Sequence, residues 1–301
     1  MNQKKNNKKI ILFIYIKNYY YNFIYLINKI TNYSLEKRRF KKKLGYRPNL
    51  RNPKSFNEKI IWKKKNIINP LITLTSDKHL VRSYVKKKLG KKAKKILIPL
   101  IYVTKKPNSI PFNLLPDNFI IKANHSSGRN IIIKNGKFNR KEIEKKCKNW
   151  LKENYGLKKM ELGYKNINRK IIIEKLITDE HGNIPKDFKF YVFNGVCKLI
   201  HVDFNRFKSQ ERSFYTNNWE YLNISLKYRK GPNIERPQKL EKMIQIVEKL
   251  SEEFSFARVD LYLLKNKIYF GEITHYPGSG TKQFNPKEFD FILGEYWELE
   301  K

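Results

Sequence analysis

Cysteine is nearly absent from this chain, and long apolar runs are missing. Only Cys147 and Cys197 are present, far apart and without the spacing of metal ligands or of a redox pair. This excludes a disulfide framework and fits a reducing compartment, so we expect a cytoplasmic protein. The apolar segment 10–16 ends at Lys17, short of the roughly 20 residues that a membrane-spanning helix needs. No small-residue cleavage site follows it, so we expect no secretory signal.

Acidic residues are also scarce. The chain has 27 Asp and Glu against 65 Lys and Arg, which gives a formal net charge of +38. Such an excess is typical of proteins that bind polyanions. Here the lysines are spread along the whole length, and no zinc-finger spacing, RRM signature or isolated basic helix accompanies them. We therefore expect a solvated basic surface and no specific nucleic-acid partner.

Glycine-rich nucleotide-binding motifs are absent from the sequence. It contains neither a GxGxxG fingerprint nor a GxxxxGK[ST] P-loop, which argues against a Rossmann or P-loop origin. With 40% hydrophobic residues, of which many are aromatic, the 301 residues suffice for one large or two small globular domains.

Residues 1–45 form a basic amphipathic region. Lysines at positions 4, 5, 8 and 9 precede an aromatic-rich stretch, and further Lys and Arg residues follow between positions 37 and 43. An apolar face with basic flanks can lie on anionic lipid, which would place the protein peripherally at the inner face of the membrane. The same periodicity is equally typical of a helix packed on its own domain, so both alternatives stay open.

The rest of the chain alternates between short strands and helices. We predict helices over 76–85, with Ser76 or Asp77 as the cap, 139–157 and 237–253. The predicted strands span 96–103, 119–123, 130–134, 170–177, 188–193, 198–204, 256–263 and 267–273. Strands joined largely by hairpins, with helices interspersed, predict an α+β fold.

Two carboxylates on neighbouring predicted strands are the first candidates for chemistry. Arg258, Asp260 and Tyr262 share one face of their strand, and pairing across the following turn can bring Asp260 and Glu272 together. A divalent cation that bridges ATP phosphates would neutralise such a pair. A plain ion pair between Asp260 and Arg258 is the commoner explanation of these charges taken alone.

A lysine at the end of another predicted strand is the second candidate. Lys122 precedes the small polar loop 123–128, which contains Ser126, Ser127 and Gly128. A lysine beside serine and glycine amides can hold phosphate, because it offers a positive charge next to backbone N–H donors. Taken by itself, the segment is more commonly an ordinary hairpin loop.

Several ordered stretches of the chain are similar to one known family. The sequence resembles the TupA-like ATP-grasp family, grouped with polysaccharide and teichuronopeptide biosynthesis, over roughly residues 40–299. The resemblance rests on segments 44–50, 53–59, 77–82, 122–128, 173–176, 187–195, 271–274, 277–280 and 284–286. It implies an ATP-grasp fold in which two α+β lobes enclose a nucleotide cleft behind an N-terminal helical extension.

The resemblance also implies domain limits and a nucleotide site. Residues 1–45 would be the basic amphipathic region, 46–118 a pre-grasp region and 119–301 the ATP-grasp lobes. Lysines would contact the phosphates, the loop at 126–128 would close over them, and segment 174–176 would meet the adenine. The implied ATP-binding residues are Lys78, Lys122, Ser126, Ser127, Gly128, Glu174, Lys175, Leu176 and Lys189.

The metal and catalytic residues follow from the same resemblance. Asp260 and Glu272 match the Mg²⁺ ligands, while Arg258 and Lys122 match the cations that act on the transferred phosphate. The sequence departs from the ATP-grasp pattern at Thr274, where an Asn usually completes the metal set, and His275 or Asn285 are the candidate replacements.

The implied activity is an ATP-dependent carboxylate-amine ligase in cell-surface polysaccharide or capsule synthesis, working through an acyl phosphate. Its partners would be a glycan or uronic-acid carboxylate and an amine donor. The alternatives are a glycosyltransferase, although no Asp-x-Asp motif is present, and a non-enzymatic basic protein of membrane surfaces or nucleic acids.

Overall fold

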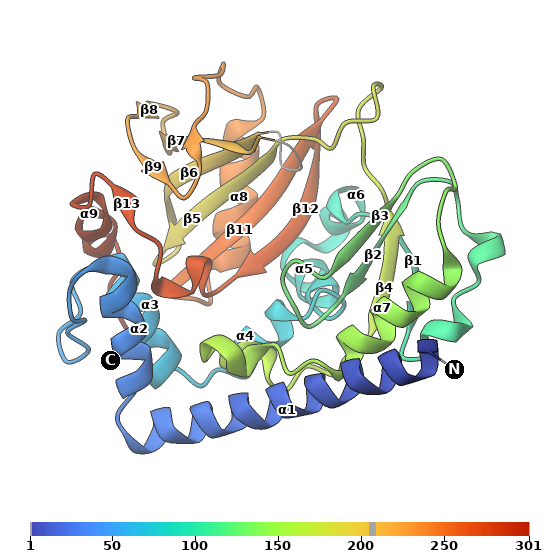
Figure 1. The fold of residues 1–301 in the computed structure, drawn as a ribbon. Helices are drawn as coiled ribbons and strands as arrows, with labels where there is room; N and C mark the ends of the chain where they lie inside the picture. Colours follow the sequence, from blue (N-terminus) through green and yellow to red (C-terminus); the bar gives the residue numbers. More distant parts are fainter. Residues whose placement is uncertain (1, 205–208, 301) are drawn as a thin grey trace. The chain divides into compact units, whose positions relative to one another are not determined.

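The structure is a computed structural model that describes residues 2–204 and 209–300 (Figure 1). The chain divides into two compact units, and each is built from several separate segments. Unit 1 comprises Met1–Leu35, Asn69–Leu80 and Ile98–Leu176, and unit 2 comprises Glu36–Ile68, Val81–Leu97 and Ile177–Lys301. The expected division at residues 45 and 118 stays a prediction.

Unit 1 is built on a four-stranded antiparallel sheet in the order β1-β4-β2-β3. Its strands are β1 (Leu100–Thr104), β2 (Phe119–Ala123), β3 (Asn130–Ile133) and β4 (Ile171–Lys175). Its helices are α1 (Asn2–Ile30), α4 (Pro70–Ser76) and α7 (Arg140–Lys152), with short 3₁₀ turns at Pro107–Ser109, Phe112–Leu114, Gly156–Lys159 and Leu162–Tyr164.

The core of unit 1 lies between its sheet and α7. Asn139 caps α7 by accepting from the backbone N–H of Glu142 at 3.1 Å. The helix then buries Ile143 and Cys147, which pack with Phe119 and other apolar side chains of the sheet. Burial raises the pKa of the Cys147 thiol to about 12, so it is an inert core residue.

Unit 2 is built on a seven-stranded sheet in the order β10-β7-β6-β5-β11-β12, with β8 paired to β7. Its strands are β5 (Asp187–Phe193), β6 (Val196–Phe204), β7 (Glu211–Thr216), β8 (Tyr221–Leu222), β10 (Arg229–Lys230), β11 (Phe256–Leu264) and β12 (Lys267–Thr274). A separate two-stranded sheet pairs β9 (Ser225–Leu226) with β13 (Phe284–Asn285). The helices are α2 (Ser34–Leu44), which begins in unit 1, α3 (Phe56–Asn66), α5 (Val81–Leu89), α6 (Ala93–Ile96), α8 (Leu240–Ser251) and α9 (Phe289–Glu295), with short 3₁₀ turns at Gly90–Lys92 and Pro277–Gly280.

The two faces of the large sheet are covered differently. Helix α8 lies behind β5 and β11 in the view of Figure 1 and buries an apolar stripe that includes Met243 and Val247. On the other face α3 packs at one end, where Phe56 meets the rings of Phe193 and Phe256. A capping box between Ser55 and Glu58 fixes the start of α3. The remainder of this second face carries charged side chains.

The predicted α+β fold is confirmed, and most predicted strands match within a few residues. The predicted helix 76–85 is wrong at its start: Asp77 accepts from the backbone N–H groups of His79 and Leu80 in a turn, and α5 begins only at Val81. The predicted strand 96–103 begins only at Leu100, because Ile96 is the last residue of α6 and residues 97–99 lie outside the strand. The predicted helix 139–157 ends at Lys152. Strand β7 was not predicted.

Among the described residues, no helix combines the length and apolar character needed to cross a membrane.

Candidate active site

Strands β11 and β12 carry the two carboxylates singled out by the sequence. Their register pairs Asp260 with Glu272 directly. One residue further along, Leu261 pairs with Phe270, so Gly271 is an extra residue in β12. Residues two apart on a regular strand share a face, so without this bulge Glu272 would lie on the apolar face with Phe270. The bulge moves Glu272 to the face of Asp260.

The bulge depends on glycine because the two strands approach closely there. A Cβ atom on Gly271 would lie 2.9 Å from the backbone carbonyl oxygen of Asp260. That contact is too short for real Cβ atoms, so any larger residue would push β12 away from β11 at the carboxylate pair.

Arg258 links the two carboxylates. Its Nε donates to Oδ1 of Asp260 at 2.7 Å, and its Nη2 donates to Oδ2 at 2.8 Å, which makes a bidentate pair. The same Nη2 lies 3.1 Å from Oγ1 of Thr274 and 3.6 Å from Oε1 of Glu272. Thr274 in turn donates to Oε1 of Glu272 at 3.3 Å. The hydroxyl of Thr274 thereby fixes Glu272 relative to Arg258.

Strand β5 adds a lysine and a third carboxylate to the same face. Lys189 pairs in register with Asp260, and its Nζ donates to Oδ2 of Asp260 at 2.5 Å and also to the carboxylate of Asp187. All three side chains are buried. Lys189 is a predicted site residue, whereas Asp187 was not predicted. The available signal was its position two residues before Lys189, on the same face of the strand.

The charged face continues onto β6 and β7. The register places His201 beside Lys189 and Asp203 beside Asp187. On β7, Nε of Arg212 donates to Oδ1 of Asp203 at 2.7 Å. These three residues on β6 and β7 were not predicted from the sequence, although His201 and Asp203 repeat the same spacing of two that Asp187 and Lys189 show.

His201 is a buried neutral imidazole within this face. The centroid of its ring lies 5.5 Å from that of Tyr191 and 5.3 Å from that of Phe214. Its Nε2 is 3.8 Å from Oδ2 of Asp203, and neither ring nitrogen has a hydrogen-bond partner in the described part of the chain. Burial lowers the pKa of His201 well below its usual value, and the neighbouring arginines and Lys189 lower it further.

The charges on this face nearly balance. It holds four carboxylates and three cations, so at their ordinary charges it carries one negative charge in excess: Asp187, Asp203, Asp260, Glu272, Lys189, Arg212 and Arg258.

Burial and ion pairing shift the pKa values of Asp260 and Arg258 in opposite directions. Burial raises the pKa of Asp260, while Arg258 and Lys189 act to lower it. Burial acts to lower the pKa of Arg258, but Asp260 outweighs it and the pKa is raised. Arg258 therefore stays protonated at all ordinary pH values.

Unit 1 pairs two other predicted site residues with each other. Nζ of Lys122, on β2, donates to Oε2 of Glu174, on β4, at 2.7 Å. Lys122 is half-buried and Glu174 is buried. A partly accessible lysine held by one carboxylate can exchange that partner for a phosphate oxygen, since both are anionic acceptors.

The loop after β2 is organised by Asn124. Its side-chain amide donates to Oδ1 of Asp77, and its Oδ1 accepts from the backbone N–H of Lys170. Nζ of Lys78 donates to the backbone carbonyl of Ser126 at 2.8 Å, so two predicted phosphate-binding residues are in direct contact. Ser126 is buried, and its Oγ lacks a hydrogen-bond partner within the described residues.

The remaining predicted residues of unit 1 are placed as follows. Ser127 and Gly128 are exposed, and Gly128 has a φ of +75°, which favours glycine. At the end of β4, the backbone N–H of Lys175 donates to the carbonyl of Pro99, and that of Leu176 donates to the carbonyl of Asn118. An adenine at this segment would have to replace these partners or use other groups.

The structure thus brings four predicted residues together in unit 2 and two pairs together in unit 1. Within the described residues, no group of three or more His, Cys, Asp or Glu side chains is arranged to hold a metal ion. Two further residues were suggested as metal ligands. His275 is buried with its ring 4.7 Å from that of Phe254, and Asn285 is exposed in β13. The roles of the predicted residues stay predictions.

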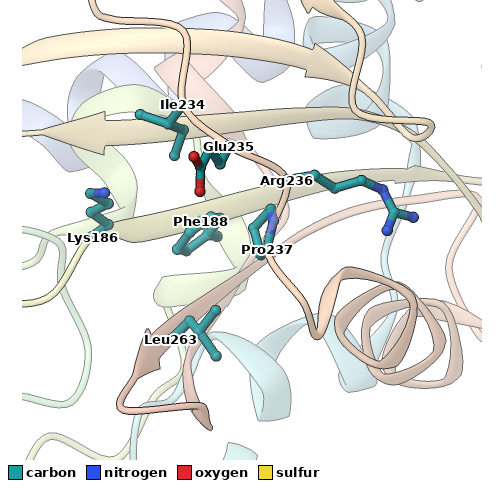
Figure 2. A pocket seen from close by; sticks show the side chains of 7 residues that line it. All are labelled: Lys186, Phe188, Ile234, Glu235, Arg236, Pro237 and Leu263. Atoms are coloured by element: carbon teal, nitrogen blue, oxygen red, sulfur yellow. The ribbon is translucent and has the colours of Figure 1, made fainter.

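Unit 2 also has a hollow of about 470 Å³ that is separate from the charged face (Figure 2). Its wall includes Phe188 and Leu263, which share the apolar face of the sheet with Leu261. Figure 2 shows Glu235 and Pro237 close to Phe188, whereas the guanidinium of Arg236 extends away. Arg236 is paired with Glu241 instead. The hollow therefore opens on the opposite side of the sheet from Asp260.

A comparison with protein-family models gives one match. The model of TupA-like ATP-grasp proteins matches residues 58–298, which is most of the chain and includes every predicted site residue. No curated protein matches the sequence.

Solved structures of ligases are similar to the chain at low identity. D-alanine–D-alanine ligase from Helicobacter pylori is 17% identical with a TM-score of 0.42, and the match covers 76% of this chain and 60% of that one. The Bacillus anthracis enzyme complexed with ATP is 14% identical with a TM-score of 0.38, covering 67% and 54%. The ATP-grasp ligase PsnB, complexed with a precursor variant, Mg and ADP, is 10% identical with a TM-score of 0.41, covering 79% and 64%. In each case the matched region spans less than two thirds of the solved protein.

Proposed function

The chain belongs to the TupA-like ATP-grasp family, and from this premise we propose that it is an ATP-dependent carboxylate-amine ligase of cell-surface polysaccharide synthesis. The observation that supports an ATP-driven reaction is the register pairing of Asp260 with Glu272, with Arg258 reaching both. Family membership supports ATP as the cosubstrate. The substrate class comes from the sequence resemblance and is an analogy.

The carboxylate pair fits a hard divalent cation. Mg²⁺ is usually held by one or two carboxylates, with water and phosphate oxygens completing its octahedron. Asp260 and Glu272 supply that donor set, and Glu272 remains about one third exposed. Both oxygens of Asp260 are engaged by Arg258 and Lys189, so metal binding would exchange at least one of these contacts. When bound, Mg²⁺ would neutralise phosphate oxygens.

The cations on the charged face have a second task in this proposal. A substrate carboxylate oxygen attacks the γ-phosphorus of ATP, the bond from that phosphorus to the bridging oxygen breaks, and ADP leaves. Negative charge spreads over the transferred phosphoryl group, and Arg258 and Lys189 are suited to balance it. An amine then attacks the acyl carbon of the acyl phosphate, loses a proton and releases inorganic phosphate. The product is an amide.

In unit 1 the same proposal assigns phosphate contacts to lysines. Lys122 would exchange Glu174 for a phosphate oxygen, and Lys78 would support the loop at Ser126 through its carbonyl contact. The buried Oγ of Ser126 is a hydroxyl available for an anionic oxygen.

ADP release is the direct test. The purified protein would be incubated with ATP and Mg²⁺ and supplied in turn with uronic acids, uronic-acid-containing oligosaccharides and amino acids. We expect ADP release that requires both a carboxylate and an amine, and hydroxylamine should trap the acyl phosphate when the amine is omitted. Transfer of sugar from a nucleotide-sugar donor, with no ADP formed from ATP under any combination, would instead favour the glycosyltransferase alternative.

A further inference from the structure

Helix α1 has one face that belongs to the core of unit 1. The side chains of Ile14 and Asn28 are buried. Nδ2 of Asn18 donates to the carbonyl of Lys152 at 2.8 Å, and Oδ1 of Asn18 accepts from the backbone N–H of Asn154 at 3.0 Å. These contacts hold α1 against the end of α7, so the helix has a fixed rotation about its axis.

The opposite face of α1 is apolar and exposed. Tyr19 is 82% exposed and Ile30 is 75% exposed, and their neighbours on the stripe are exposed by more than half. The stripe recurs at alternating steps of four and three residues, which keeps it on one side of a helix: Leu12, Ile16, Tyr19, Phe23, Leu26 and Ile30. Phe13, Tyr15 and Tyr20 widen it.

The angular positions separate these two faces cleanly. At 3.6 residues per turn, the centre of the exposed apolar face falls about 180° from the face that carries Ile14 and Asn18, and the exposed face spans about 160°. Lys17 and Lys29 fall at its two edges, and both are exposed. Their ammonium groups lie 4.2 Å from the ring centroid of Phe13 and 5.4 Å from that of Tyr25.

The positive charge of α1 indicates which kind of partner covers its exposed apolar face. The chain contains no acidic residue before Glu36, whereas α1 contains six lysines, so the helix is uniformly cationic. A second copy would bring lysine against lysine, and a two-stranded seam needs only a narrow stripe of residues. A broad apolar face flanked by lysines is instead complementary to a lipid bilayer, which has an apolar interior and can carry anionic headgroups.

We propose that α1 is a docking helix that lies flat on a bilayer containing anionic lipid. Because its other face is packed on unit 1, the helix binds in the plane of the interface, where such helices sink about 5–10 Å. The tyrosines suit that depth, since their rings are apolar and their hydroxyl groups reach water or headgroups. The catalytic residues proposed above play no part in this contact.

Vesicle co-flotation of the full-length protein tests the proposal. We expect binding to vesicles of equimolar phosphatidylglycerol and phosphatidylcholine, and much weaker binding to phosphatidylcholine alone. The triple variant Ile16→Ser/Phe23→Ser/Leu26→Ser should bind the anionic vesicles at least about tenfold more weakly, because it removes three side chains that would enter the acyl boundary. The variant Lys17→Gln/Lys29→Gln should lose about fivefold per lysine and most of the preference for anionic lipid.

Matched controls separate this surface from general stickiness. Leu114→Ser and Ile68→Ser remove side chains that are as exposed and as apolar but lie outside α1, and they should leave vesicle binding unchanged. Circular dichroism and thermal unfolding would confirm that every variant is folded. Equal flotation of the triple variant and the parent would overturn the proposal. So would a concentration-dependent dimer in sedimentation that the same triple variant abolishes, because the face would then be covered by a second copy.

Discussion

Asp260 and Glu272 face each other across β11 and β12 only because β12 contains one extra residue, Gly271, between Phe270 and Glu272. The bulge changes which face of the sheet Glu272 occupies, and Arg258 then reaches both carboxylates. The proposed metal site therefore depends on the backbone conformation at a single glycine.

Substituting Gly271→Ala should damage the metal site. The added Cβ would lie 2.9 Å from the carbonyl oxygen of Asp260, so the strands must separate at a cost of about 1–3 kcal/mol. We expect a higher Mg²⁺ requirement for ADP release. Gly195→Ala is the control, since it strains a turn at φ +83° with open space around it and leaves β12 alone. An unchanged Mg²⁺ requirement in Gly271→Ala would argue against a metal at the carboxylate pair.

The variant Asp260→Asn should lose both activity and stability. It removes one negative partner from the buried Lys189 and from the partly buried Arg258, and breaking a buried ion pair in this way typically costs about 3–5 kcal/mol. Urea unfolding and ADP assays measure the two effects separately. Substantial ADP release by Asp260→Asn would contradict the assignment.

Removing Lys122 should weaken nucleotide binding. Lys122→Ala deletes a charge-assisted phosphate partner worth roughly 1.5–3 kcal/mol, or about ten- to a hundredfold in affinity. Calorimetric titration with a non-hydrolysable ATP analogue gives the value directly. Lys137→Ala, which removes an exposed lysine of the same unit, should bind as the parent does. Glu174→Gln separates a direct role of Lys122 from a structural one, because it breaks the same ion pair and keeps the lysine.

Lys63 should make stability depend on pH in the alkaline range. Burial lowers the pKa of Lys63 to about 7, and its Nζ donates to the carbonyl of Phe256 at 2.7 Å. Between pH 7 and about 10.4, the pKa of an unperturbed lysine, the unfolded chain holds a proton that the folded chain lacks. This contribution to the free energy of unfolding therefore rises with pH across that window. In Lys63→Met the rise should be smaller, as urea unfolding at several pH values would reveal.

Two buried histidines should make the stability of the protein depend on pH in the acidic range. Burial lowers the pKa of His125 to about 4, and burial also lowers the pKa of His201 well below its usual value. Below about pH 6.5 the unfolded chain takes up protons that these folded rings refuse, so stability falls as pH falls. His201→Phe removes one such group and should reduce the slope of unfolding free energy between pH 6.5 and pH 4. If the slope equalled that of the parent, His201 would have the same pKa in the folded and unfolded chains, which would contradict its burial as a neutral ring.

Several features of the molecule could be read from the sequence because they depend on local patterns. The strand at 119–123 shows strict alternation, and Asn194-Gly195 supplies a hairpin turn, so β2 and the β5–β6 hairpin follow from adjacent residues. The α+β class and the family follow in the same way from ordered short segments. The amphipathic character of α1 was equally visible, but a periodic apolar face does not reveal which side the protein itself will cover.

Tertiary structure decided what local patterns could not. The face on which Glu272 lies depends on the bulge at Gly271, which exists only because β11 and β12 pair in one register. Asp187, His201 and Arg212 join the charged face because three other strands align beside β11, and no spacing within one strand encodes that alignment. Likewise Asn18 meets Lys152 across 134 positions of sequence, and this long-range contact is what turns the apolar stripe of α1 outward.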